Sequence, residues 1–133
     1  MERAKPTLPD HADLLTAGSD ETKDTFWLHD LRVEVVSEGR PMTCGHHEGE
    51  AFLVEGEDLV FRQGTRFSLY ALSALLPLLP AKQRDTHEND WMSTDDKVAC
   101  PDPHCGAHFR IVRTGRRALR HALTTGLPEH RQR

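Results

Sequence analysis

Hydrophobic and charged residues alternate along residues 28–39, where Leu31, Val33 and Val35 are separated by charged side chains. A period of two is typical of a strand that buries one face. The segment therefore predicts a strand that ends at Gly39. Similar but shorter apolar segments predict four more strands, over residues 51–56, 58–61, 97–100 and 107–113.

The longest apolar segment, residues 69–81, has a different period. Its leucines recur at helical spacing, and Ser68 is a candidate N-cap for a helix. Pro77 and Pro80 are expected to end this helix, because proline lacks the N–H that a helix interior needs. The leucines of the predicted stripe are Leu69, Leu72, Leu75, Leu76 and Leu79. Residues 81–96 are mostly polar and predict a surface loop in which Trp91 and Met92 anchor inward.

The order of these segments predicts an α+β fold, with a small, mainly antiparallel sheet covered by one apolar helix. The 133 residues suffice for a single domain. We expect a flexible N-terminal arm over residues 1–25, the α+β domain over residues 26–114 and a basic C-terminal helix or tail over residues 115–133.

Charge and hydropathy exclude several classes of function. The net charge of −4 gives no overall attraction to nucleic acid, and the basic C-terminal segment has no aromatic residue to stack on bases, so nucleic-acid binding is not expected. The apolar segment is too short to span a bilayer, and the charged N-terminus lacks the apolar core of a signal peptide. These features predict a cytoplasmic protein, in which disulfides are unusual.

Cysteine and histidine are concentrated in two predicted turns. Residues 44–47 read Cys-Gly-His-His, and residues 100–108 read Cys-Pro-Asp-Pro-His-Cys-Gly-Ala-His. Thiolate and neutral imidazole are ligands of zinc and iron, and turns present them without interrupting a sheet. The two turns therefore predict a zinc or iron site. The candidate ligands are Cys44, His46, His47, Cys100, His104, Cys105 and His108, and the favoured set is the three cysteines with one of His46 or His47.

Two other interpretations of these residues stay open at this point. The cysteines could be buried core residues and the histidines exposed loop residues. Alternatively, Cys100 or Cys105 could form a thiolate–imidazolium pair with His104, oriented by Asp102.

The turn around Cys44, the apolar segment and the Cys-Pro-Asp-Pro motif at residues 100–103 together resemble an uncharacterised family of small bacterial and archaeal proteins. The resemblance covers residues 29–114 and carries no established activity. Its first motif here is Cys44, Gly45, His46, Gly49 and Glu50. Many relatives have a cysteine at the start of the helix, where this chain has Ser68. If that cysteine is a metal ligand in them, the resemblance implies that Cys105 or His104 replaces it as a ligand here.

We therefore expect a small metal-binding protein that serves as an accessory or stabilising subunit of a metabolic enzyme. An apolar helix in so small a domain often packs against a partner, so a protein partner or a homo-oligomer is predicted. The alternative is an independent enzyme with an open metal position or a reactive cysteine, acting on a small polar or aromatic substrate.

Overall fold

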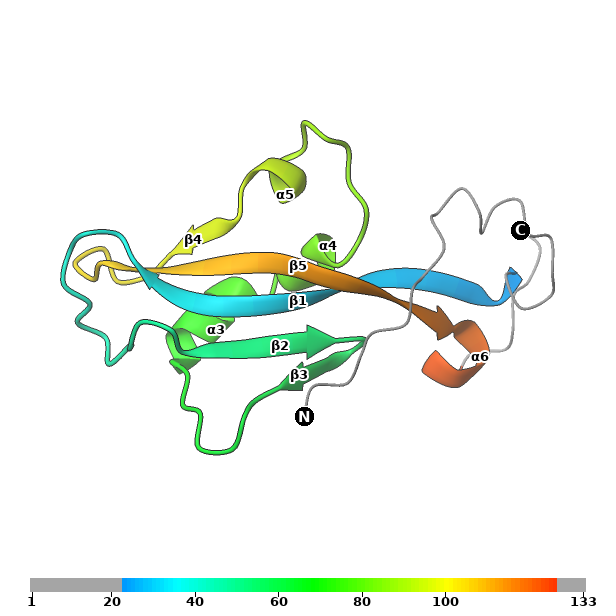
Figure 1. Cartoon of the computed structure of the whole chain (residues 1–133), viewed down its shortest axis with the longest axis horizontal. Helices are drawn as coiled ribbons and strands as arrows, with labels where there is room; N and C mark the ends of the chain where they lie inside the picture. The colour runs from blue at the N-terminus through cyan, green and yellow to red at the C-terminus, as the bar shows by residue number, and fades with distance from the viewer. Residues whose placement is uncertain (1–22, 127–133) are drawn as a thin grey trace.

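The computed structural model describes residues 23–126 and contains one five-stranded antiparallel sheet (Figure 1). The strand order is β3-β2-β1-β5-β4. The strands are β1 (Thr25–Ser37), β2 (Ala51–Glu55), β3 (Asp58–Val60), β4 (Lys97–Ala99) and β5 (Ala107–Arg120). All four strand pairs are antiparallel, as the sequence pattern predicted.

The two long central strands, β1 and β5, pair along their whole length, from Thr25 opposite Arg120 to Ser37 opposite Ala107. A register shift between Asp30 and Leu31 divides this ribbon in two. Only the half that begins at Leu31 is flanked by the other strands. The loops that follow β1 and precede β5 consequently lie at the same end of the sheet (Figure 1).

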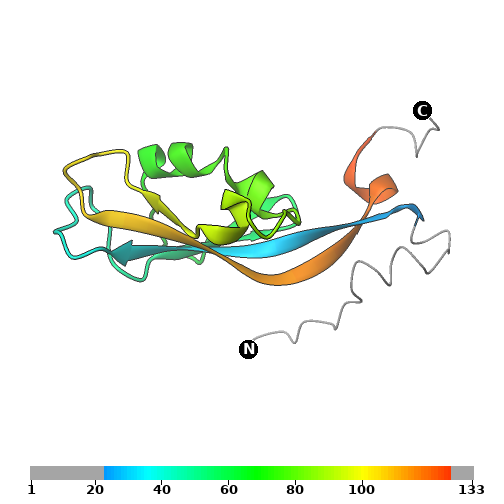
Figure 2. The same cartoon turned by 90° about the horizontal axis from the view of Figure 1, so that it is seen from above.

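Short helices cover one face of the sheet, as Figure 2 shows for α3 (Leu69–Leu75) and α4 (Leu79–Lys82). Strand alternation directs one set of side chains from the sheet toward these helices. The buried core contains, among others, Leu31, Val33, Val35, Phe52, Val54, Leu75, Leu79, Phe109 and Ile111. The broad α+β prediction is therefore confirmed.

The prediction of one continuous apolar helix over the sheet is not confirmed, because two short helices occupy that segment. Ser68 does cap α3, and its hydroxyl accepts the N–H of Ala71 at 3.2 Å. After α3 the chain tightens, and the N–H of Leu78 donates to the carbonyl of Leu75. Pro77 has no N–H to continue the helical ladder, and α4 begins with Pro80 in its first turn. Leu69 stays 74% exposed, so the predicted stripe is only partly buried.

The segment predicted as a surface loop contains the end of α4 and a further short helix, α5 (Trp91–Thr94). Trp91 is 76% exposed, so the prediction that it anchors the loop inward is wrong. The buried Lys82 performs that role instead, since its ammonium group donates to the carbonyls of Met92 and Asp95.

Residues 115–120 continue β5, where the sequence predicted a basic helix or tail. They pair with residues 25–30 of β1, and the buried Asp30 accepts two hydrogen bonds from Arg117, at 2.6 and 3.1 Å. A short helix, α6 (His121–Thr124), follows. The predicted flexible arm falls mainly on residues 1–22 and the end of the predicted tail on residues 127–133, and both of these ranges lie outside the described residues. Between residues 23 and 126, the helices are all too short or too polar to cross a membrane.

Candidate metal centre

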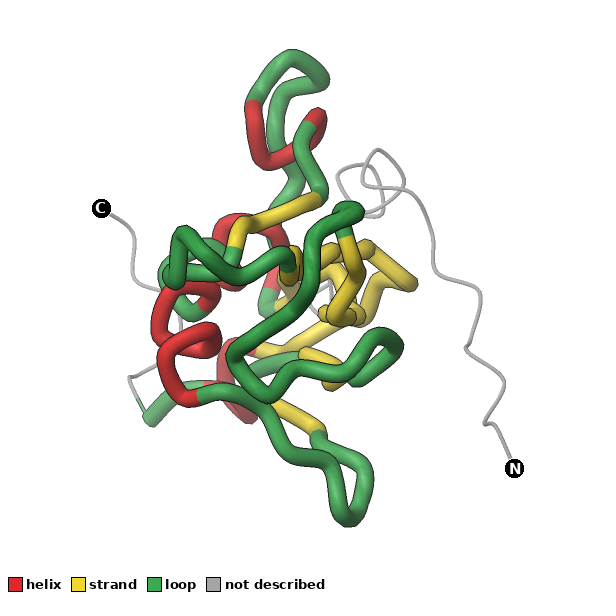
Figure 3. Tube along the Cα trace, turned by 90° about the vertical axis from the view of Figure 1, so that its left-hand side faces the viewer, coloured by secondary structure: helices red, strands yellow, loops and turns green. Residues whose placement is uncertain are grey.

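The loop between β1 and β2, residues 38–50, meets the loop between β4 and β5, residues 100–106, at one end of the sheet (Figure 3). The N–H of Gly106 donates to the carbonyl of Pro41 at 2.9 Å, and the N–H of Cys100 donates to the carbonyl of Ala107 at 3.1 Å. At Gly106 the two loops are so close that a Cβ would lie 2.6 Å from the carbonyl carbon of Arg40. Only glycine permits this approach.

Four of the predicted ligands come together where the loops meet. Their donor atoms all lie within 4.8 Å of one another, close enough to hold one metal ion. The first loop provides Cys44 and His46, and the second provides Cys100 and Cys105. None of the cysteines forms a disulfide. The two turns that the sequence singled out thus contribute to one cluster.

The spacing of these atoms fits a tetrahedral ion. Ligands placed about 2.3 Å from a tetrahedral metal lie about 3.8 Å from one another. The sulfur atoms of Cys44 and Cys100 are 3.8 Å apart, and Nε2 of His46 lies 3.9 Å from the sulfur of Cys100. The widest separation in the set is 4.8 Å, so the other pairs would shorten by at most about 1 Å around an ion.

The sulfur of Cys105 lies in a pocket of backbone N–H groups. The N–H of Thr43 lies 3.3 Å from this sulfur. Burial raises the pKa of Cys105, but the N–H groups of Ala107, Thr43 and Cys44 more than offset burial and lower the pKa to about 6. Cys105 is therefore a thiolate at neutral pH, which is the form that binds metals.

Cys44 has the opposite environment. Burial raises its pKa to about 12, and its thiol also donates to the carboxylate of Asp102 at 3.3 Å. The same carboxylate accepts the backbone N–H of His104 at 2.9 Å, which lowers the pKa of Asp102. Asp102 thus contacts a ligand sulfur and also holds the turn that carries Cys105. Cys44 would lose its proton on binding a metal.

His46 is buried, only 5% exposed, and packs edge-on against Phe109 with ring centroids 5.1 Å apart. Burial lowers the pKa of His46, which keeps its imidazole neutral near pH 7. A neutral imidazole has a free lone pair for a metal. Because His46 is packed against the core, its ring is held in place before any ion binds.

The other three predicted ligands are not part of the cluster. His47 follows His46 but is exposed, with its backbone N–H bonded to the carboxylate of Glu50 at 2.8 Å. His104 is also exposed. His108 lies on β5 between the buried Ala107 and Phe109, so strand alternation places it on the opposite face of the sheet.

Asp102 is the residue of this centre whose contact the sequence did not predict. It was considered as a partner of the His104 ring, whereas its carboxylate contacts the sulfur of Cys44 and a backbone N–H. The sequence feature that could have drawn attention to Asp102 is its position between Pro101 and Pro103. No protein-family model, curated protein or solved structure matches the chain.

Proposed function

We propose that this protein binds one zinc ion through Cys44, His46, Cys100 and Cys105, and that the ion fastens the two loops together. The observation that carries the proposal is the convergence of these four donor atoms within 4.8 Å. Three thiolates and one imidazole are a common ligand set of structural zinc. Iron, the other metal that the sequence suggests, is usually bound by sulfur alone when its site is tetrahedral.

Four protein ligands complete a tetrahedral shell and leave no position for water or substrate. This argues against an independent metalloenzyme and favours a structural role. The loops that the ion would join also contact one another through hydrogen bonds, among them those from Gly106 to Pro41 and from Glu38 to Gly106. Because a metal that binds only the folded chain stabilises the fold, zinc should raise the stability of the whole domain.

Metal content and thermal stability test the zinc proposal together. Protein isolated without added metal should contain about one zinc per chain and little iron, as measured by elemental analysis. Removing the zinc with a chelator should lower the melting temperature, and adding zinc back should restore it. A chain that folds with no bound metal and melts at the same temperature with or without zinc would refute the proposal.

We further propose that the domain serves as an accessory or stabilising subunit, attached to a protein partner or to a second copy of itself. The support is a group of large apolar side chains that are exposed in the described part of the chain. Tyr70 at the start of α3 is 78% exposed, and Leu69 and Trp91 are similarly accessible. The three free thiols suit a reducing compartment such as the cytoplasm. The resemblance to the uncharacterised bacterial and archaeal family belongs to the same proposal.

Affinity purification of the tagged chain from its native host, followed by light scattering, tests the partner. We expect either a co-purifying enzyme or a mass above that of the 15.1 kDa monomer. Tyr70→Ser should weaken that association, whereas Gly126→Ala, an exposed substitution outside α3 and α5, should not. A clean monomer with no enzyme attached would contradict this part of the proposal and leave the zinc proposal standing.

A further inference from the structure

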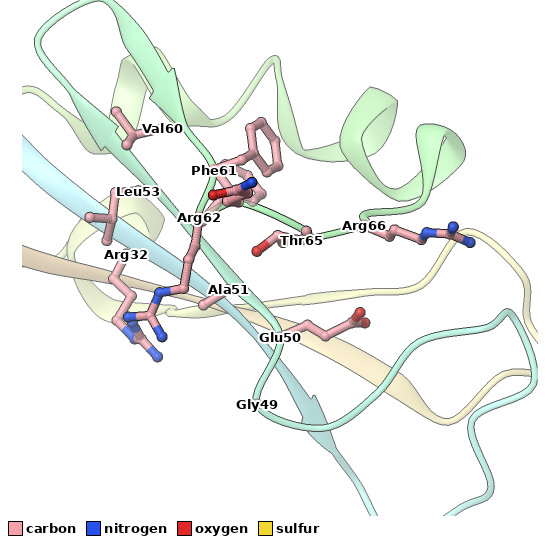
Figure 4. Close-up of a pocket in the computed structure, with 13 residues that line it drawn as sticks. Arg32, Gly49, Glu50, Ala51, Leu53, Val60, Phe61, Arg62, Thr65 and Arg66 are labelled. Carbon is pink, nitrogen blue, oxygen red and sulfur yellow. The ribbon is translucent and has the colours of Figure 1, made fainter.

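A pocket of about 650 Å³ lies beside the outer face of β1 and β2, lined also by β3 and the chain that follows it (Figure 4). This volume is in the range of small-molecule sites. Its lining combines apolar side chains, such as Leu53 and Val60, with three arginines, Arg32, Arg62 and Arg66, and one carboxylate, that of Glu50. The residues that line it include none of the four proposed zinc ligands.

Strand pairing builds one wall of the pocket. Arg32 of β1 is opposite Leu53 of β2, which in turn is opposite Val60 of β3. Because Leu31 and Val33 point into the core, Arg32 points to the other face of the sheet. Leu53 and Val60 continue this face across β2 and β3 with apolar side chains.

A tight turn at residues 62–65 forms the opposite wall of the pocket. The N–H of Thr65 donates to the carbonyl of Arg62 at 2.9 Å, and Gly64 between them has a φ of +83°, which favours glycine. Figure 4 shows the Arg62 side chain extending from this turn toward Arg32, while Arg66 extends away from both. The hydroxyl of Thr65 also lies on the pocket side of the turn.

The two converging arginines are poorly neutralised by the protein. Arg32 forms a long ion pair in which its Nε lies 3.5 Å from the carboxylate of Glu34. Within residues 23–126, the guanidinium group of Arg62 has no carboxylate or carbonyl partner. Two like charges that point toward one another repel unless an anion lies between them. The chain as a whole has a net charge of −4, so this positive pocket does not follow from its overall charge.

We propose that the pocket binds a small organic anion, a carboxylate or phosphate ester with an aromatic or aliphatic body. Arg32 and Arg62 donate to the anionic oxygens, since guanidinium groups match carboxylate and phosphate geometry. The hydroxyl of Thr65 supplies a further donor. The apolar body lies over Leu53 and Val60, which gives preference for an organic anion over an inorganic one.

Nuclear magnetic resonance titration of the zinc-loaded full chain tests this proposal. The probes are phenyl phosphate, benzoate, inorganic phosphate and the neutral benzyl alcohol, each added up to roughly 10 mM to reach millimolar dissociation constants. We expect phenyl phosphate or benzoate to shift the amides of residues 49–53 and 60–66 in a saturable way. If only one of the two anions gives a saturable shift, the pocket selects phosphate esters or carboxylates accordingly. Benzyl alcohol should give no saturable shift.

Two arginine variants make the test specific. Arg62→Gln should weaken binding of the responding anion by roughly tenfold or more, because it removes a charged donor. Arg84→Gln is the matched control, since it removes one exposed positive charge outside the pocket and should leave the affinity unchanged.

Several results would overturn the proposal. These are an absence of shifts with both organic anions, equal affinity for benzyl alcohol or for inorganic phosphate, and unchanged affinity in Arg62→Gln. Shifts at the same amides that depend on protein concentration, with no anion added, would assign the pocket to contact between copies of the chain. That result would also overturn it.

Discussion

Replacing Gly106 with alanine tests whether the two loops must stay close for the metal to bind, and it changes no ligand. A Cβ at this position would lie 2.6 Å from the carbonyl carbon of Arg40 and closer still to its oxygen. Real Cβ atoms essentially never come within 3.0 Å of another group, so the loops must separate by more than 0.4 Å, which is the difference between 3.0 and 2.6 Å for the carbonyl carbon alone. The obstacle is backbone, which cannot rotate away.

That displacement is large on the scale of metal coordination. Metal–ligand distances in a well-formed site vary by only about 0.2 Å. Cys105 precedes Gly106 directly, so its sulfur moves with the displaced loop, away from Cys44 and His46 of the other loop. We expect zinc affinity to fall by about tenfold to a hundredfold, the usual cost of disturbing groups that orient metal ligands. Loss of the hydrogen bond from Gly106 to Pro41 should lower the stability of the metal-free protein by about 1 kcal/mol.

Competition with a chromophoric chelator measures the zinc affinity, and denaturant unfolding of the metal-free protein measures the stability separately. Gly126→Ala is the control, because a Cβ there meets nothing within 4 Å. If Gly106→Ala bound zinc within twofold of the original affinity, the loops would not need this close approach. The reasoning from the loop geometry would then be refuted.

Three further predictions concern the ligands, protons and core. Cys44→Ser and Cys100→Ser should each remove most of the zinc and lower the melting temperature, whereas His104→Ala should change neither the zinc content nor the melting temperature. Elemental analysis measures the zinc content, and equal content in these three variants would contradict the ligand set. The raised pKa of Cys44 keeps its thiol protonated in the metal-free protein, so zinc binding should release at least one proton, and the zinc affinity should increase by up to about tenfold for each unit of rising pH. Calorimetry in buffers of different ionisation enthalpy measures the number of protons released. A release of no protons would contradict this prediction. Leu75→Ala, at a fully buried site, should cost about 2–5 kcal/mol of unfolding free energy with zinc stoichiometry unchanged; a cost below about 1 kcal/mol in denaturant unfolding would contradict the described packing.

The sequence predicted those parts of the fold that depend on local patterns. Alternation identified the strands, and Ser68 marked the start of α3. The length of β5 could not be predicted, because residues 115–120 form a strand through pairing with residues 25–30, far away in the chain. The break between α3 and α4 was also not predicted. Pro77 and Pro80 were expected to end one helix, whereas a second short helix begins between them.

For the metal centre, the sequence identified both loops and all three cysteines. It could not choose between His46 and His47, because adjacent residues point in different directions and the backbone decides which one faces inward. Here Gly45, with a φ of +75°, precedes the buried His46. His108 could have been excluded, because it alternates with the apolar Phe109 and Ile111 along a predicted strand and so points to the other face of the sheet. The arginine pocket was not predicted, because Arg32 and Arg62 are 30 positions apart and meet only through the pairing of three strands.

X-ray absorption spectroscopy at the metal edge of the protein as isolated tests the central claim most directly, because it counts the atoms bound to the metal. We expect zinc with three sulfur ligands at about 2.3 Å and one nitrogen at about 2.0–2.1 Å, and no oxygen. The nitrogen should disappear from the first shell in His46→Ala and remain in His47→Ala. A shell with fewer than three sulfurs, or one made of oxygen and nitrogen alone, would contradict the assignment of Cys44, His46, Cys100 and Cys105 as the metal ligands.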